Sequence, residues 1–258
     1  MNYGLYLSAS GVLTNMHRQD VIANNMANIS TAGFKRQLVQ FSQRDAEAVE
    51  DHLGPDAAHE LLDRLGGTVF VEPSRLSQDS GPLNATGNEL DIALQGEGFL
   101  IVQTGEGTDG STALTRDGRL AVAQDGRLIT ATGEHAVLST DNQPIYVDRG
   151  QRVEIDQHGF VRQGGAAVGR IQVAQVDAAA RVRHRGEGLY TADEEAMANR
   201  RPGRAIVRQG FLESSNVEPT RQLVELIETA RAITNNSNMI RYHDLLMDRA
   251  VNQLGRVA

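Results

Sequence analysis

The apolar residues from Leu223 to Leu254 recur at alternating intervals of three and four, which is the pattern of a helix that packs against other helices. Pro219 suits a first helical turn, Gly255 follows the last apolar position, and no glycine or proline interrupts between them. The pattern predicts one unbroken helix of roughly 50 Å, although residues 234–238 at its middle are less helix-favouring. The seam positions are Leu223, Leu226, Ala230, Ile233, Ser237, Ile240, Asp244, Met247, Val251 and Leu254.

The N-terminal segment has the same period, and only one of its seam positions is polar. Gly4 and Gly11 weaken this helix, and the polar cluster from Asn28 to Gly33 predicts its end. Because burying one face of a long helix does not offset the entropy of ordering it, both helices are expected to order fully only against partner helices. The alternative is a long core helix of a compact domain. The N-terminal seam positions are Leu5, Ala9, Val12, Met16, Gln19, Ala23 and Met26.

Between the helices the pattern changes to short strands separated by glycine turns, after a short exposed helix expected at 56–65. The predicted strands are 68–71, 90–94, 99–103, 145–147, 153–155, 169–176 and 205–211. The turn pairs, which indicate a meander of hairpins, are Asp109-Gly110, Asp117-Gly118, Asp125-Gly126 and Thr132-Gly133. The fold class is therefore α+β, with long terminal helices that pair as a coiled coil and an all-β centre. The expected domains are 1–35 (N-terminal helix), 36–67 (linker with a short helix), 68–212 (β-rich core) and 213–258 (C-terminal helix).

Charge and composition exclude several classes of protein. A formal net charge of −8 argues against a nucleic-acid binder and against a protein that binds anionic membranes. No apolar run is long enough to span a bilayer, so no membrane insertion is expected, and the N-terminus lacks the pattern of a cleaved signal peptide. The chain has no cysteine, which excludes a disulfide framework, a thiolate metal site and a cysteine nucleophile.

The sequence offers little catalytic or ligand-binding chemistry. His59-Glu60 could begin a zinc motif, but Asp63 stands where the second histidine would be needed. Gly96-x-Gly98 leads into an apolar strand and not into a helix, so a tight turn is expected there and not a phosphate site. We therefore predict no catalytic, cofactor-binding or metal-binding residues, no cofactor and no enzymatic activity. The alternative is a free-standing β-rich binding module or hydrolase whose helices are ordinary core.

Four motifs, in order along the chain, resemble those of the flagellar rod and hook axial family, and most closely its basal-body rod proteins. Residues 20–36 (DVIANNMANISTAGFKR) are similar to the family's N-terminal signature. Residues 81–99 (GPLNATGNELDIALQGEGF) and 114–120 (LTRDGRL) resemble its core-domain motifs. Residues 212–217 (LESSNV) resemble the entry to its terminal helix. Together these matches span nearly the whole chain.

The resemblance implies a structural subunit whose terminal helices form a coiled-coil layer around a hollow axial tube. The implied partners are other rod and hook subunits, further copies of the chain, and the flagellar export apparatus. The implied location is the periplasmic rod of the basal body, reached without a cleaved signal peptide. Hook proteins of the family carry further outer domains that this chain is too short to hold, so a rod protein is favoured. The segment 81–87 favours the proximal over the distal rod.

The predicted assembly interface combines the two apolar seams with three asparagines near the end of the first helix. Buried asparagine in a helical interface reduces stability but fixes register, because only one alignment pairs its amide. Asn24, Asn25 and Asn28 are therefore expected to have a positional role; the alternative is that they are only polar residues at a fraying helix end. The interface residues are Leu5, Ala9, Val12, Met16, Ala23, Asn24, Asn25, Asn28, Leu223, Leu226, Ala230, Ile233, Ile240, Met247, Val251 and Leu254.

Overall fold

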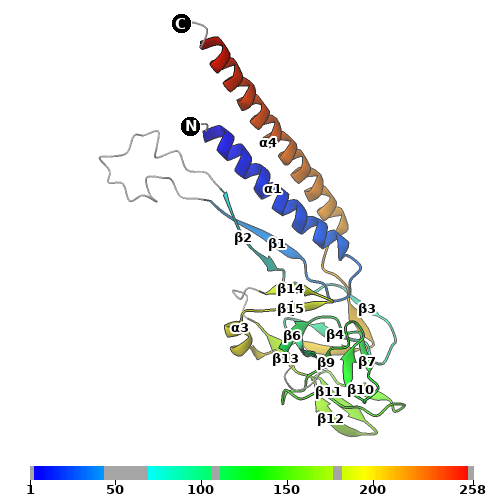
Figure 1. The fold of residues 1–258 in the computed structure, drawn as a ribbon. Helices are drawn as coiled ribbons and strands as arrows, with labels where there is room; N and C mark the ends of the chain where they lie inside the picture. The colour runs from blue at the N-terminus through cyan, green and yellow to red at the C-terminus, as the bar shows by residue number, and fades with distance from the viewer. Residues whose placement is uncertain (1–2, 44–68, 106–110, 177–181, 255–258) are drawn as a thin grey trace. The chain divides into compact units, whose positions relative to one another are not determined.

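The structure is a computed structural model that describes residues 3–43, 69–105, 111–176 and 182–254. It contains two long helices, α1 (Tyr3–Ala27) and α4 (Pro219–Leu254), and a short helix, α3 (Glu194–Ala198) (Figure 1). The short helix expected at 56–65 lies outside the described residues. The strands are β1 (Gln37–Gln43), β2 (Val69–Leu76), β3 (Leu83–Ala85), β4 (Ile92–Gln95), β5 (Phe99–Thr104), β6 (Ser111–Thr115), β7 (Leu120–Val122), β8 (Leu128–Thr130), β9 (Ala136–Val137), β10 (Val153–Ile155), β11 (Phe160–Gln163), β12 (Ala166–Arg170), β13 (Val173–Gln175), β14 (Arg183–Gly186), β15 (Leu189–Thr191), β16 (Arg201–Pro202), β17 (Ile206–Gln209) and β18 (Phe211–Glu213).

The chain divides into two compact units. The first unit, here the helical unit, takes in α1 to residue 26, most of the paired strands β1 and β2 (residues 38–43 and 69–74), and α4. The second, here the β unit, takes in residues 27–37 and 75–218. The predicted α+β class, with terminal helices and a β-rich centre of short strands, is confirmed. Coiled-coil pairing and the four domain boundaries stay predictions.

The heptad pattern predicted α4 correctly as one unbroken helix, including its polar middle at 234–238. Thr234 fits there because its hydroxyl donates to the carbonyl of Ala230 at 3.0 Å, which satisfies the hydroxyl within the helix. α1 likewise runs without a break through Gly4 and Gly11. None of the helices among the described residues is long and apolar enough to cross a membrane.

The β unit is organised around β5, which is the centre of a nine-stranded sheet. Leu100 and Val102 pack into one hydrophobic cluster, while Phe99 and Ile101 pack into another. Because successive side chains of a strand point to opposite faces, this sheet has a core on each side. Separate pairs of strands, β4 with β17 and β3 with β18, carry the chain towards α4.

The hairpin predictions were right at two turns and wrong at one. Antiparallel pairing joins β7 to β8 across Asp125-Gly126 and β8 to β9 across Thr132-Gly133. Asp117-Gly118 does not close a hairpin, because β6 pairs with β5 and β15 and not with β7. Gly118 is instead required by a close approach: a Cβ there would lie 1.6 Å from the carbonyl oxygen of Ile92. The turn expected at 109–110 lies outside the described residues.

Three predicted strands were wrong in extent. Residues 145–147 make backbone hydrogen bonds to residues 126, 128 and 137, but their one β-bridge, between Tyr146 and Arg127, is isolated, so they form no strand. The predicted strand 169–176 is split between β12 and β13, and 205–211 is split between β17 and β18 at Gly210. Gly210 has φ of 79°, a left-handed conformation that interrupts an extended run. The turn predicted at 96–98 is confirmed between β4 and β5.

Candidate functional site

The chain segments that follow α1 and precede α4 are bonded to each other within the β unit, and we call residues 33–36 and 213–216 the joint. The amide of Gly33 donates to the carbonyl of Glu213 at 2.8 Å, and the amide of Asn216 donates to that of Phe34 at 3.3 Å. The Asn216 side chain accepts from the amide of Arg36 at 2.7 Å. The two segments at which the terminal helices leave the β unit are therefore held together by backbone and amide hydrogen bonds.

Three buried charges fix the joint, and we call Lys35, Arg116 and Glu213 the charge cluster. The Lys35 ammonium donates to Glu213 Oε1 at 2.7 Å and the Arg116 guanidinium to Oε2 at 2.9 Å, with each side chain at most 2% exposed. Arg116 also donates to the carbonyls of Leu94 at 3.1 Å and Gly96 at 2.6 Å. The cluster thus ties the segment that follows α1 and the segment that precedes α4 to the centre of the β unit.

The charge cluster holds one more positive than negative charge, and burial acts on both cations. Burial lowers the pKa of Lys35, and the nearby Arg116 charge lowers it further, while Glu213 opposes both effects. Burial also lowers the pKa of Arg116, again against the Glu213 carboxylate. A carbonyl acceptor at Asp79, 2.7 Å from the Lys35 ammonium, adds to the stabilisation. Glu213 is therefore the shared counter-charge on which both buried cations depend.

Aromatic side chains pack around the residues that follow α1. The Tyr190 hydroxyl accepts from the amide of Lys35 at 2.8 Å and donates to the carbonyl of Gly33 at 3.1 Å. Burial raises the pKa of Tyr190, so the hydroxyl keeps the proton that it donates. His184 lies between the rings of Phe34 and Tyr190, with centroid distances of 5.5 and 5.2 Å. The backbone between 33 and 35 is thereby held in place by one phenol.

His184 should make the stability of the β unit depend on pH. Its Nδ1 accepts from the amide of Gly186 at 3.2 Å, which requires the neutral ring, and burial lowers its pKa below the ordinary 6.5. The unfolded chain therefore binds the proton first, so stability is lost as pH falls below about 6.5 towards the folded pKa. We expect His184→Gln to flatten the decline in Tm between about pH 7 and pH 5, measured by circular dichroism. The exposed His158→Gln should leave the slope unchanged; a flattening there, or none at His184, would contradict this assignment.

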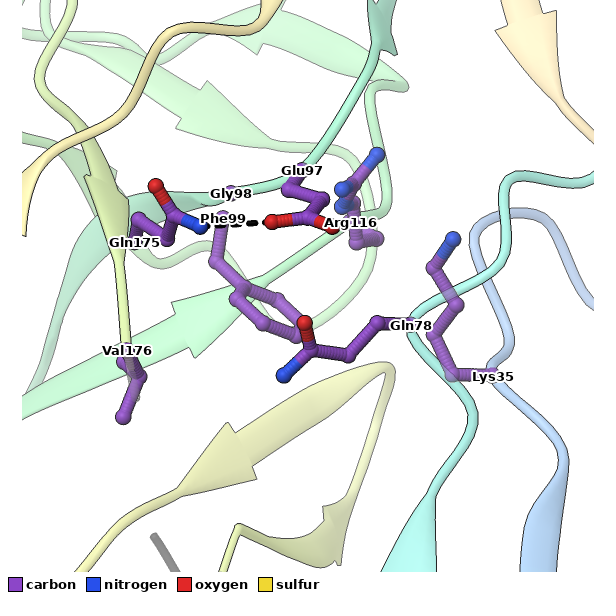
Figure 2. A pocket seen from close by; sticks show the side chains of 8 residues that line it. All are labelled: Lys35, Gln78, Glu97, Gly98, Phe99, Arg116, Gln175 and Val176. Carbon is purple, nitrogen blue, oxygen red and sulfur yellow. Dashed lines mark hydrogen bonds between the residues drawn. The ribbon is translucent and has the colours of Figure 1, made fainter. Parts of the chain in front are cut away.

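A cavity beside Arg116 is too small for a cofactor. Its volume of about 10 Å³ is room for roughly one water molecule, and two residues that line it are bonded to each other, with Gln175 donating to Glu97 at 2.6 Å (Figure 2). Among the described residues, no group of three His, Cys, Asp or Glu side chains could hold a metal ion. The residues lining this cavity are Lys35, Gln78, Glu97, Gly98, Phe99, Arg116, Gln175 and Val176.

In the helical unit, α1 and α4 lie side by side and antiparallel (Figure 1). Asn25 Nδ2 donates to Gln222 Oε1 at 3.2 Å. A Cβ at Gly11 would lie 2.6 Å from the Asn236 amide, and one at Gly4 would lie 2.7 Å from the His243 ring. From Gly4 to Gly11 to Asn25 the residue number on α1 rises by seven and then by fourteen. Over the same contacts the residue number on α4 falls by seven, from His243 to Asn236, and then by fourteen, to Gln222. One constant antiparallel alignment therefore connects all three.

Four polar residues of α4, one in each successive heptad, face α1 directly, and we call Gln222, Thr229, Asn236 and His243 the polar heptad. The alignment places Thr229 opposite Arg18, midway between the contacts at Gly11 and Asn25. Gln222 and Thr229 are each 1% exposed and Asn25 is 2% exposed. The helix contact inside one chain is thus centred on polar and glycine positions, with the half-buried Leu226, Ile233 and Ile240 of α4 beside them.

The predicted seam residues are not the centre of this contact, although Leu226, Ile233 and Ile240 lie three or four positions from members of the polar heptad and so share its face of α4. In an antiparallel pair, the residue after each contact residue turns towards the same side of the pair, so the exposed seam residues of both helices border one flank, here the apolar flank. Exposed members are Leu5, Met16, Ala23, Leu223, Ala230, Met247 and Val251. Half-buried members are Ala9, Val12, Leu226, Ile233 and Ile240. Leu254 ends α4, and its side chain lies outside the described residues.

The three asparagines do not behave alike. Asn25 is buried in the helix contact, Asn24 is exposed, and Asn28 is half-buried in the β unit. The Asn28 side chain accepts from the Thr31 hydroxyl at 3.2 Å, in the turn that ends α1. The structure therefore brings Asn25 into contact with α4, at Gln222.

Sequence reasoning missed Glu213, Arg116 and Gln222. The sequence contains one feature that could have drawn attention to the charge cluster: Lys35 is the only lysine among the 25 lysine and arginine residues. Its partner stands 178 positions away, and a single sequence carries no information that joins the two. Gln222 was missed because the apolar pattern drew attention to the neighbouring Leu223.

Three family models match successive parts of the chain. Residues 5–35 match the model described as flagella basal body rod protein. Residues 93–163 match the flagellar hook protein FlgE/F/G D1 domain. Residues 208–254 match the flagellar basal body rod FlgEFG protein C-terminal model.

Full-length relatives agree with these matches. A flagellar basal-body rod protein FlgF of Caulobacter vibrioides is 31% identical over 257 residues, covering 100% of both chains. A flagellar basal-body rod protein FlgG of Bacillus subtilis is 30% identical, covering 96% of this chain and 97% of the relative. A flagellar hook-basal body complex protein FlhO of Bacillus subtilis is 26% identical, covering 98% and 99%.

Proposed function

Because the chain belongs to the flagellar basal-body rod protein family, we propose that it is a structural subunit of the rod that assembles through α1 and α4. The observation that carries this proposal is the apolar surface that α4 leaves uncovered within one chain. Leu246 is 61% exposed, Val251 67% and Tyr242 62%. Large apolar side chains gathered along a helix mark an interaction surface.

The proposed occupant of this surface is the same pair of helices in neighbouring subunits, either further copies of this chain or other rod and hook subunits. Such helices are themselves apolar on the matching side, so each contact removes apolar area from water on both partners. The apolar flank is one such surface, with Leu5 and Met16 on α1 and Leu223 and Met247 on α4. The polar heptad supports this assignment: because it occupies the contact within one chain, the exposed apolar residues of the flank remain available to a neighbouring subunit.

The chain is proposed to reach its place through the flagellar export apparatus, without a cleaved signal peptide, and to lie in the periplasmic part of the rod. We favour the proximal rod, on the resemblance of the segment 81–87. The β unit is proposed to form the outer layer of the rod, with the helices around the central channel. Imaging of labelled subunits in isolated basal bodies tests this placement.

Two substitutions on the exposed face of α4 test assembly directly. Met247→Asp and Val251→Asp place a charge on side chains that are 46% and 67% exposed in the single chain, so they should leave its folding intact. In an assembled interface each buried carboxylate is costly, and we expect at least roughly a tenfold loss of incorporation into basal bodies. Ile240 is less suitable, because it is half-buried towards α1.

The control is Asn238→Asp, which adds the same charge to an exposed polar position of α4. It should assemble normally, as judged by co-purification with basal bodies and by swimming in soft agar. Normal incorporation of both Met247→Asp and Val251→Asp would overturn assembly through this face. If the two aspartate substitutions lower the Tm of the isolated chain as severely as they impair assembly, α4 is an ordinary core helix and not an assembly surface.

A further inference from the structure

The contact between α1 and α4 uses the less apolar of two available faces. One residue further along each helix, the same antiparallel arrangement would bring Ala9 opposite Ile240 and Met16 opposite Ile233. We call this alternative arrangement, in which the two apolar seams meet, the second facing. Hydrophobic burial alone favours the second facing, yet in the structure the polar heptad faces α1. Something other than apolar area therefore selects the facing.

The selecting feature lies at the buried end of the pair. Asn25 and Gln222 are 2% and 1% exposed, and their amides are joined by a hydrogen bond of 3.2 Å. Turning either helix to the second facing would separate these amides, and a buried amide that loses its partner is costly. A single polar residue at a helix interface selects one arrangement for this reason, at the expense of stability.

The glycines of α1 complete the same arrangement. A Cβ at Gly11 or Gly4 would come within 2.6 or 2.7 Å of the Asn236 and His243 side chains, so a larger residue would force the ends of these polar side chains to move. The sequence pattern presents these glycines only as weak points of a helix. In the structure they give room to Asn236 and His243, two members of the polar heptad.

We infer that Asn25 and Gln222 are a positioning pair that turns the polar heptad towards α1 and so keeps the exposed seam residues of both helices, such as Leu5, Met16, Leu223 and Met247, on an open flank. The pair acts within one chain and involves no contact with another subunit. It deepens the proposed function, because it explains how these apolar side chains stay uncovered before a neighbour arrives.

Cross-linking in the isolated chain tests the pair, and the native chain has no cysteine to interfere. Gly11→Cys with Asn236→Cys reports the observed facing, and Val12→Cys with Ser237→Cys reports the second. In the native background the first pair should form the intramolecular disulfide at least about tenfold faster. In Asn25→Ala/Gln222→Ala this preference should fall by about tenfold or invert.

The exchanged variant Asn25→Gln/Gln222→Asn keeps an amide on each helix and should restore the preference for the first disulfide. A role in packing alone would change helix content or Tm in both variants and leave the ratio of disulfides unaltered. The inference is overturned if the alanine variant keeps the native ratio, or if the native chain forms both disulfides equally. The cross-linking experiment measures no assembly, so it is independent of the proposed function. The positioning pair can be disproved while the chain still incorporates into rods, and it can be supported while incorporation fails.

Discussion

Exchange of Glu213 for glutamine is expected to lower the free energy of unfolding of the β unit by about 3–5 kcal/mol, and its Tm by on the order of 10 °C. Lys35 and Arg116 are both bonded to this carboxylate and both almost fully buried. Glutamine keeps the size and one acceptor but removes the charge, so two cations remain buried without their shared partner. Urea unfolding of the full chain, followed by circular dichroism, measures the loss.

The ranking of the variants by their loss of unfolding free energy is as informative as the size of each loss. Lys35→Met leaves a neutral Arg116–Glu213 pair, so it should cost less than Glu213→Gln. The double variant should cost less than the two single losses together, because the three groups form one network. Glu154→Gln, at an exposed position of β10, should change stability by less than about 0.5 kcal/mol. A cost at Glu213 no larger than at Glu154 would show that the charge cluster does not hold the joint.

The long helices could be predicted from the sequence because their evidence is local and repeated. From Leu223 to Leu254 every three or four residues add the same signal, and neither the asparagines at 234–238 nor the glycines of α1 outweighed it. The face that one helix turns to the other could not be predicted this way. An apolar pattern identifies the side chains that burial removes from water, whereas Gln222 faces α1 and accepts one hydrogen bond there, from the Asn25 side chain.

The joint lay beyond sequence reasoning for a different reason. Its parts come from residues 33–36, 116 and 213–216, and only the β unit's topology brings them together. The short strands show the same limit: the pattern at 145–147 is apolar in alternation, but pairing requires a neighbour of suitable length, and only Arg127 supplies a bridge. Local pattern predicts that a segment is extended and does not predict with what it pairs.

Gly33→Ala is expected to damage the joint more than any ordinary glycine substitution in a turn. Gly33 has φ of 68°, where a Cβ is disfavoured by about 1–2 kcal/mol. The same Cβ would lie 2.3 Å from the carbonyl oxygen of Arg116 and 2.8 Å from the amide nitrogen of Asp117. These are backbone atoms, which cannot rotate away as the end of a side chain could, so one of the two segments must move.

Gly87 supplies the matched control for this prediction, since its φ is 72° and nothing lies within 4 Å of a Cβ placed there. Gly87→Ala should therefore show the conformational cost alone, about 1–2 kcal/mol, while Gly33→Ala should lose at least about twice as much in urea unfolding. Displacement at Gly33 also strains the hydrogen bond that its backbone amide donates to the carbonyl of Glu213, and with it the charge cluster, so basal-body incorporation should fail in this variant and persist in Gly87→Ala. Equal losses of stability in the two variants would mean that the approach of the Arg116 backbone to Gly33 imposes no constraint, and that the joint tolerates a wider spacing than the structure shows.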